Sequence, residues 1–266
     1  MTLIAANPMN LQQCADAANP GDSIELGSGI YENNWRGSSV LKIRRSGSPG
    51  LPITFLPALN AMPIIAAAEN WAGILVEAAN YIRIERLPVT GIARLLTYEG
   101  ALAASTLPST ARYSANGISI YNSRNVVVRN CTITDMPGGG IYAVGCDYLT
   151  IDRNIVTGCC MWSRYGQSGI SVHKSAAVNA STATKIKVRY NSCHGNENRI
   201  PWEMTGKIQD GHGIIFDECQ DYPAPMLAYR NLCVGNGGLA IQALTAPTAV
   251  LVENIGQWND RSNVTV

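Results

Sequence analysis

The sequence predicts an all-β protein built as a single right-handed parallel β-helix, a solenoid with a short N-terminal capping helix. Three observations predict it: a glycine-led segment that recurs five times, a second strand-like run after each copy, and the lack of a two-residue hairpin turn between alternating runs. Self-similarity with a period of about 20 to 50 residues is typical of chains that stack one structural unit on the next. We therefore expect one domain over residues 1–266.

The repeated unit is a glycine followed by a run of alternating apolar and other residues. Its five copies begin at Gly117, Gly140, Gly169, Gly213 and Gly238. The second runs place five asparagines in the same predicted register: Asn130, Asn154, Asn191, Asn231 and Asn254. Short β-branched strands between turns suit a coil that stacks on the preceding coil, and parallel crossovers are nearly always right-handed. A β-barrel or a sandwich is the competing all-β prediction, but those folds rely on hairpins.

The two ends of the chain are expected to differ. Residues 1–60 form the N-terminal cap and first coils, where a short helix turns one apolar face toward the open first coil; that face carries Leu11, Cys14, Ala15 and Ala18. Residues 61–260 form stacked coils with insertions at about 158–168 and 194–211. The final "NVTV" is typical of a strand without a cover, so we expect truncation or a partner surface there, and a monomer or a weak oligomer through this exposed C-terminal end.

Composition excludes several function classes. The formal net charge is +1 and only 15% of residues are charged, so no basic face for nucleic acid is expected. No apolar run approaches the roughly 20 residues that a spanning helix needs. The eight cysteines lack the spacing of a zinc site, and most are expected to be buried free thiols. The first residues do not form an export signal, so we expect a secreted or periplasmic protein whose leader is not in this sequence, with a cytoplasmic protein as the alternative.

Strand alternation assigns a direction to each side chain. Residues one and three positions after each repeat glycine should point inward, and those two and four positions after it outward. His173 and Asp217 hold equivalent outward positions on successive coils, which lie about 4.8 Å apart. Tyr121, Tyr142 and Gln242 are expected on the same face. The histidine and the carboxylate form either a catalytic pair or a surface hydrogen bond.

The two insertions are expected to stand as walls beside this outward face, since long structured loops on a rigid stack usually carry function. They hold Trp162, Arg164, Tyr165, Arg199, Trp202, Glu203, Lys207 and Asp210. Aromatic rings beside cationic donors suit an acidic sugar chain. Structural alternatives remain open: Trp202 next to Pro201 only fixes the loop, and Arg199 pairs with Glu197 or Glu203.

Two stretches, "MWSRYGQSGISVHKS" and "NRIPWEMTGKIQDGHGIIFDE", resemble bacterial right-handed β-helix proteins of the pectate-lyase-like superfamily, in particular polysaccharide lyases akin to families nine and thirty-one. This resemblance implies a lyase that cleaves a uronate-containing, acidic polysaccharide by β-elimination in a groove on the outer face. Members of that family usually carry an asparagine and two aspartates where this sequence has His212 and the pair Asp217 and Glu218.

The reaction implied by this resemblance needs a cation for the uronate carboxylate, a base for the proton on the adjacent carbon, and an acid for the leaving oxygen. The expected catalytic residues are Lys207 as base, Arg199 as carboxylate clamp, and Tyr165 or His173 as acid. The expected substrate-binding residues are Trp162, Arg164, Tyr142, Tyr121, Trp202 and Gln242. Asp210, Asp217 and Glu218 are expected to gather Ca²⁺, although alternation points Glu218 inward and an Asp-Gly pair also marks a simple turn.

Other functions remain open at this point. A glycoside hydrolase would use Asp210 with Asp217 or Glu203 as paired carboxylates. A uronate epimerase would share the proton abstraction. A glycan-binding, tailspike-like module would hold sugar on Trp162, Tyr142 and Tyr121 without cleaving it.

Overall fold

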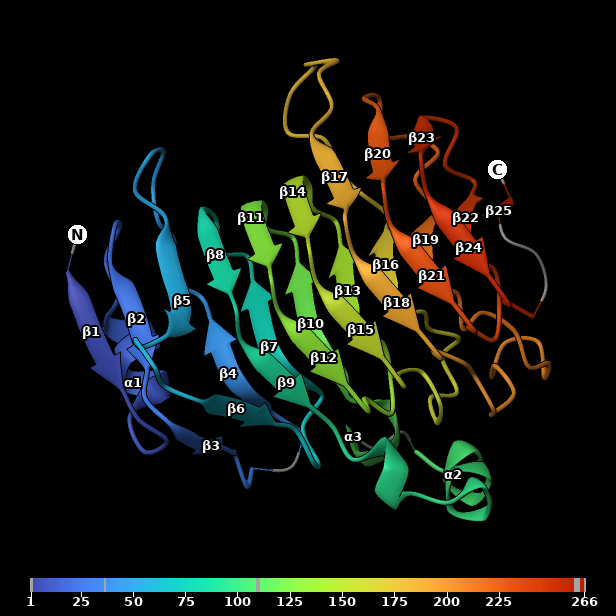
Figure 1. Ribbon diagram of the computed structural model, residues 1–266, viewed down its shortest axis with the longest axis horizontal. Helices are drawn as coiled ribbons and strands as arrows, with labels where there is room; N and C mark the ends of the chain where they lie inside the picture. Colours follow the sequence, from blue (N-terminus) through green and yellow to red (C-terminus); the bar gives the residue numbers. More distant parts are fainter. Residues whose placement is uncertain (1, 36, 109–110, 261–263, 266) are drawn as a thin grey trace.

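Three parallel sheets run along the molecule, and each coil of the chain contributes one strand to each sheet (Figure 1). In this computed structural model, residues 2–35, 37–108, 111–260 and 264–265 are described. The chain passes from sheet 2 to sheet 1, then to sheet 3, and back to sheet 2 one coil further along. The predicted parallel β-helix is confirmed.

The strands of each sheet follow the order of the coils. Sheet 1 contains β1 Leu3–Ala6, β2 Ser23–Leu26, β5 Ile53–Pro57, β8 Ile82–Glu85, β11 Arg124–Arg129, β14 Asp147–Asp152, β17 Ile186–Arg189, β20 Met226–Tyr229 and β23 Ala249–Val252. Sheet 2 contains β4 Ser39–Ile43, β7 Ala72–Glu77, β10 Asn116–Tyr121, β13 Ile141–Val144, β16 Ile170–His173, β19 Ile214–Asp217, β22 Ile241–Leu244 and β25 Val264–Thr265. Sheet 3 contains β3 Gly29–Tyr31, β6 Pro63–Ala66, β9 Pro88–Thr90, β12 Thr132–Thr134, β15 Ile155–Thr157, β18 Ser192–His194, β21 Leu232–Val234 and β24 Ile255–Gln257.

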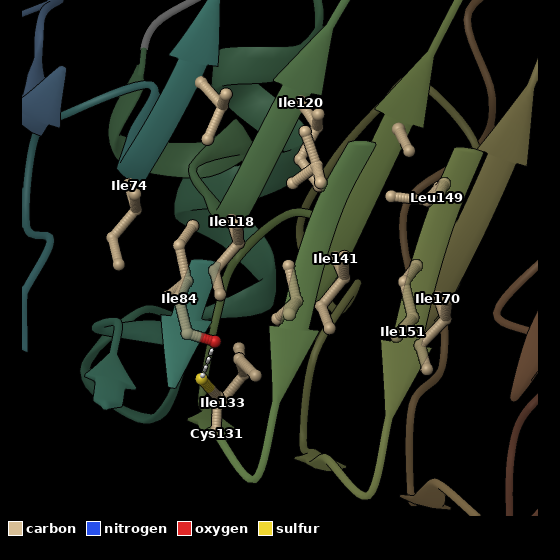
Figure 2. Packing of buried hydrophobic residues seen from close by; sticks show 14 of the residues in the cluster. Ile74, Ile84, Ile118, Ile120, Cys131, Ile133, Ile141, Leu149, Ile151 and Ile170 are labelled. Carbon is tan, nitrogen blue, oxygen red and sulfur yellow. Dashed lines mark hydrogen bonds between the residues drawn. The ribbon is translucent and has the colours of Figure 1, made fainter. Parts of the chain in front are cut away.

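The core is a stack of apolar side chains inside the coils. Ile118, Ile141, Ile170 and Ile214 are register partners on successive strands of sheet 2, and all four are fully buried. Figure 2 shows the first three lying side by side. Burying one such side chain contributes roughly 1.5–3 kcal/mol. The predicted inward positions of these four repeats are therefore confirmed.

The fifth repeat is shifted by two residues from its prediction. Ile241, not Leu239, is the register partner of Ile214, so Gln242 lies beside Ile215 rather than beside Asp217. Within β22 the shift of two leaves Ile241 inward and Gln242 outward, as predicted. The two residues before the strand differ from the prediction: Ala240, predicted outward, is buried in the core, and Leu239, predicted inward, lines a hollow beside Gln242. The extra length sits in the turn before β22, where a glycine alone does not mark the start of a strand.

An asparagine ladder links the coils at the turn between sheets 1 and 3. The Nδ2 atom of Asn154 donates to Asn191 Oδ1 (2.9 Å), Asn191 to Asn231 (3.0 Å), and Asn231 to Asn254 (2.9 Å). The prediction for Asn130 was wrong by one residue. Cys131 holds the ladder position, donates its backbone N–H to Asn154 Oδ1 (3.0 Å), and turns its thiol to the Ile84 carbonyl (Figure 2).

Helix α1, Leu11–Ala17, covers the first coil as predicted. Leu11, Ala15 and Ala18 are buried and Cys14 is half-buried against the core. Gln12 also hydrogen-bonds both backbone groups of Lys42, with its Nε2 donating to the carbonyl (2.8 Å) and its Oε1 accepting from the N–H (2.9 Å). This protects β4, the edge strand of sheet 2, from pairing with another chain.

A third insertion, between β9 and β10, was not predicted. It contains a 3₁₀ turn Ala93–Leu95, helix α2 Tyr98–Ser105 and helix α3 Ala111–Ser114. Together the three insertions form a small second core from Ala93, Leu96, Ala101, Trp162 and Ile200. The predicted insertions at 158–168 and 194–211 thus pack on one another and on this third segment (Figure 1).

The remaining predictions concern the cysteines and the ends. All eight cysteines are free, and seven are buried, as expected. No helix of the described part is long and apolar enough to cross a membrane. Of the C-terminal "NVTV", β25 pairs with β22, whereas residues 263 and 266 lie outside the described residues.

Candidate functional site

The outward side chains of sheet 2 form two parallel columns. One column contains Glu77, Tyr121, Val144, His173 and Asp217, and the other contains Ser119, Tyr142, Ser171, Ile215 and Gln242. His173 and Asp217 are direct register partners, which confirms their predicted juxtaposition. We call this surface the sheet-2 face.

A hydrogen bond joins the two columns at their centre. Tyr142 Oη lies 3.0 Å from His173 Nδ1, and the edge of the Tyr121 ring packs against the Tyr142 ring at 6.1 Å. Burial, assisted by the nearby Tyr121, Asp217 and Glu218, raises the pKa of Tyr142 above its ordinary value. Because this phenol stays protonated near neutral pH, its O–H donates to Nδ1. A neutral imidazole then carries its own proton on Nε2.

On its other side His173 faces the ion pair of Glu218 with Lys174. Its Nε2 atom is buried and lies 3.5 Å from Glu218 Oε2, while Lys174 Nζ contacts the same oxygen at 2.8 Å. Lys174 lowers the pKa of Glu218, and Glu218 raises the pKa of Lys174, so both are charged at neutral pH. Tyr142, His173, Glu218 and Lys174 thus form one continuous chain of contacts.

The inward direction predicted for Glu218 was wrong. Its φ is 48°, in the left-handed region, and its side chain is half exposed. The strand alternation stops at Asp217, because the backbone turns out of β19 at the next residue. His173 and Asp217 hold equivalent positions on successive coils. The residues that follow them, Lys174 and Glu218, could therefore have been predicted from the sequence to be neighbours as well.

Asp217 has a different environment from Glu218. Burial raises its pKa, as do the charges of Glu218 and Asp210, whereas His173 and Lys174 act in the opposite direction. A carboxyl group whose pKa is raised by burial beside a histidine is typical of proton-transfer sites.

A hollow of about 270 Å³ lies at the C-terminal end of the sheet-2 face, lined by residues that include Asp210, His212 and Gln242. His212 is buried. Its Nδ1 accepts from the Leu239 N–H (2.7 Å) and its Nε2 lies 3.4 Å from Asp210 Oδ1. It therefore joins two coils. Asp210 has a φ of 61°, in keeping with the turn alternative.

The three carboxylates do not assemble into a cation site. Asp210 faces His212, and Glu218 contacts Lys174 and His173. Within the described ranges no group of three His, Cys, Asp or Glu side chains is placed to hold a metal ion. Calcium binds several oxygen ligands at once, and these three carboxylates do not form such a set.

Three of the predicted substrate or catalytic residues instead hold the insertions together. Trp162 is buried and its Nε1 donates to the Ala93 carbonyl (2.7 Å), so its ring is not a sugar platform. Arg164 donates to two carbonyls of the third insertion, at 2.8 and 2.7 Å, and pairs with Glu203 at 3.0 Å. Arg199 pairs with Glu197, the structural alternative predicted for it, and lies over the Trp162 ring.

The other predicted loop residues are Lys207, Tyr165 and Trp202, which are not part of the Tyr142–His173 hydrogen bond. Lys207 is exposed. Tyr165 is half-buried with the Arg164 guanidinium 5.4 Å from its ring centre. Trp202 is half-buried. Its ring and the Asp210 carboxylate both lie close to Gly166, so that a side chain at residue 166 would meet them. Their predicted roles remain untested.

A larger hollow, of about 530 Å³, was not predicted and lies at the N-terminal end of the sheet-2 face. Trp71 and Tyr121 are among its lining residues, and Lys42 and Arg44 each contact Glu77 at 3.0 Å. The alternation in "SVLKIRR" places these two cations outward, which was the available signal.

The family follows from a match over most of this stack. Residues 70–255 match the family described as "Right handed beta helix region". The chain belongs to this right-handed β-helix family. That membership also confirms the predicted hand of the coils in the matched region.

Solved structures of this β-helix type include enzymes that act on polysaccharides. An alginate lyase from Paenibacillus sp. str. FPU-7 superposes with a TM-score of 0.51 at 14% identity, covering 100% of this chain and 99% of that one. The pectate lyase Pel9A gives 0.50 at 13%, covering 91% and 68%. A GH136 lacto-N-biosidase from Eubacterium ramulus gives 0.45 at 11%, covering 99% and 57%. At these identities the likeness shows a shared fold alone, and no curated protein sequence matches the chain.

Proposed function

We propose that this β-helix protein is a polysaccharide lyase that cleaves an acidic, uronate-containing chain by β-elimination on the sheet-2 face. The single observation that carries the proposal is the 3.0 Å contact between Tyr142 Oη and His173 Nδ1. Two proton-transfer groups in contact, open to a surface with hollows at both ends, supply what an elimination requires. The fold shared with an alginate lyase and a pectate lyase supports the choice of reaction.

The proton moves through the pair in both directions. Tyr142 Oη takes the proton from the carbon next to the uronate carboxylate while its own proton passes to His173 Nδ1. The C–O bond of the neighbouring glycosidic linkage breaks, and its carbon end becomes part of a C=C bond. Tyr142 then donates a proton to the departing oxygen, and the proton on Nδ1 returns to Tyr142. No net proton or electron is left over.

The charges around the pair favour this transfer. The imidazolium formed in mid-reaction lies beside the Glu218 carboxylate, 3.5 Å from Nε2. Lys174 is more than half exposed and protonated, so it can share its charge with the uronate carboxylate as electrons move toward it. His173, expected as the acid for the leaving oxygen, here accepts and returns the proton of Tyr142. Tyr142, expected to bind substrate, takes the role of base expected of Lys207 and also protonates the leaving oxygen.

The decisive experiment is product analysis with alginate and polygalacturonate. We expect unsaturated, ultraviolet-absorbing sugar ends from the wild type and none from Tyr142→Phe or His173→Ala. Tyr121→Phe is the matched control, because it removes one hydroxyl from the same face but not from the pair. Wild-type levels of product from Tyr142→Phe would refute the mechanism. Addition of a chelator tests the separate expectation that Ca²⁺ is required.

A glycoside hydrolase is the second candidate, because Asp217 has the raised pKa of a general acid and Asp210 acts on it electrostatically. Saturated reducing ends without ultraviolet absorbance would favour it. Altered uronate stereochemistry without cleavage would favour an epimerase, and binding without any product a glycan-binding module. A polymeric substrate also fits the expected secreted or periplasmic location, which fractionation of the native cells tests.

A further inference from the structure

Another hollow, of about 440 Å³, lies on the outer face of sheet 1, away from the residues of the proposed lyase site. Its floor comes from β8, β11, β14 and β17. The segments before β5 and before β17 contribute its two ends, through Gly50 and Pro52 at one and residues 183–185 at the other. Figure 1 shows these two segments projecting beyond the starts of the strands between them. We call this feature the sheet-1 hollow.

Two of the cations that line the hollow, Arg83 and Lys187, have no ionic partner among the described residues. Arg83, Val127, Thr150 and Lys187 follow one another across four strands as register partners. Three strand spacings separate the first from the last, about 14 Å. Neither Arg83 nor Lys187 forms an ion pair with another residue of the described ranges, and no described aspartate or glutamate lines the hollow.

The neighbouring column on the same sheet behaves in the opposite way. Two residues further along these strands, Glu85, Arg129, Asp152 and Arg189 alternate in sign. Arg129 contacts Glu85 at 2.8 Å and Arg189 contacts Asp152 at 3.2 Å. The charges of this neighbouring column are therefore paired, whereas Arg83 and Lys187 have no ionic partner among the described residues.

Aromatic side chains accompany the two cations. Tyr81 and Tyr148 are half-buried and line the hollow. Tyr81 immediately precedes β8, and Tyr148 is the second residue of β14. Asn125, the second residue of β11, lies between them in the register. Rings and amide groups beside cations offer apolar faces and hydrogen bonds to a sugar chain.

The wall before β17 is held by a buried charge. Asp147 is fully buried and accepts from the Val178 N–H (2.8 Å) and from Tyr222 Oη (2.6 Å), while Lys185 Nζ lies 3.2 Å away. Asn179 of the same segment donates to Tyr148 Oη (3.0 Å). The hollow is thus organised before any ligand arrives, which lowers the entropic cost of binding.

We propose that the sheet-1 hollow binds an acidic polysaccharide without cleaving it, with its carboxylates on Arg83 and Lys187. The spacing of the two cations suits a chain rather than one sugar. Nucleic acid fits less well, because its binding rests on many phosphate contacts and this protein has a net charge of only +1. This inference goes beyond the proposed lyase activity, since no bond is broken here.

The test is calorimetric titration of oligogalacturonate and oligoalginate into the His173→Ala protein, in which turnover is removed. We expect two binding sites per chain in this protein. When Arg83→Glu and Lys187→Glu are added, we expect the site in the sheet-1 hollow to disappear or to bind at least tenfold more weakly. Arg86→Glu, at an exposed arginine outside the hollow's lining, is the charge-reversal control and is compared with each of the two single substitutions. The control should keep both sites. Tyr142→Phe replaces His173→Ala if the latter does not fold.

Three results would overturn the inference: unchanged binding after the double substitution, equal binding of a neutral glucan oligomer, or tighter binding of single-stranded DNA than of either acidic glycan. If the protein forms unsaturated product but its glycan binding does not depend on Arg83 and Lys187, the inference is contradicted and the lyase proposal is not. Binding that depends on Arg83 and Lys187 in a protein that makes no unsaturated product would contradict the lyase proposal alone.

Discussion

The outer faces of sheets 1 and 2 are built on the same coils, yet they place charge in opposite ways. On the sheet-2 face, His173, Glu218 and Lys174 are in contact with one another, and Tyr142 joins them through a hydrogen bond. In the sheet-1 hollow, Arg83 and Lys187 are about 14 Å apart and lack ionic partners among the described residues. Contact between titratable groups favours proton transfer, whereas separated cations favour binding. Which outward residues are neighbours in the register therefore decides whether a face of this solenoid favours proton transfer or binding.

The largest expected effect is the loss of turnover in Tyr142→Phe. Removing the hydroxyl breaks the contact with His173 and deletes a proton-transfer group, which typically costs about 10²- to 10⁴-fold in rate. Initial rates of unsaturated-product formation measure it, with thermal unfolding as the control for an intact fold. A rate within threefold of wild type would mean that the two faces do not differ in chemistry.

The next largest effect concerns the carboxylate that organises the sheet-1 hollow. Asp147→Asn leaves the buried Lys185 without a counter-charge, and breaking a buried pair costs about 3–5 kcal/mol. Urea unfolding measures this, with exposed Asp221→Asn as the control. Destabilisation below 1 kcal/mol would show that the wall does not depend on this pair.

The pH dependence of the same group has a defined sign. Burial acts to raise the pKa of Asp147, but hydrogen bonds from Tyr222, Val178 and Tyr148, together with Lys185, hold it below its ordinary value. Its contribution to stability is therefore present above the unfolded pKa, near 4, and is lost as the pH falls through the lower folded value. The stability gap between wild type and Asp147→Asn should narrow in acid.

A smaller effect distinguishes the paired and unpaired cations of sheet 1. Arg129→Ala removes an ion pair with Glu85 and should cost up to about 1 kcal/mol, whereas Arg83→Ala should change stability by less than about 0.5 kcal/mol. Parallel denaturation curves compare them. Equal costs would imply that Arg83 has a structural partner and is not held free for a ligand.

The smallest effect is expected at Asp217 on the sheet-2 face. Because burial raises its folded pKa, the group favours folding below its unfolded pKa and loses that contribution as the pH rises through the folded value. Asp217→Asn should therefore stabilise the protein at neutral pH, by less than about 1 kcal/mol since the group is partly exposed, and not in acid. Unfolding curves at two pH values check it, and a neutral-pH loss would contradict it.

Much of the fold could be predicted because its signals are local. Alternation fixes which side chains point inward, so Ile118, Ile141, Ile170 and Ile214 could be placed from the sequence. The errors occurred where turn geometry, not alternation, sets the register. Asn130 is displaced from the ladder by one residue, and the fifth repeat begins two residues later than its glycine suggested.

The candidate site was only partly predictable, since its members depend on contacts between distant segments. The pairing of His173 with Asp217 followed from equivalent positions on stacked coils. The burial of Trp162 did not, because it depends on Ala93, part of an insertion whose packing no periodicity reveals.

By itself the sequence determined the stack: its apolar core, its capping helix, and the columns of side chains that point outward, since a period of two on a repeating coil leaves few alternatives. Tertiary structure alone decided which of those side chains work together. The Tyr142–His173 contact, the burial of Trp162, and the lack of an ionic partner for Arg83 and Lys187 among the described residues all arise from the distances between coils and insertions, which no single segment encodes.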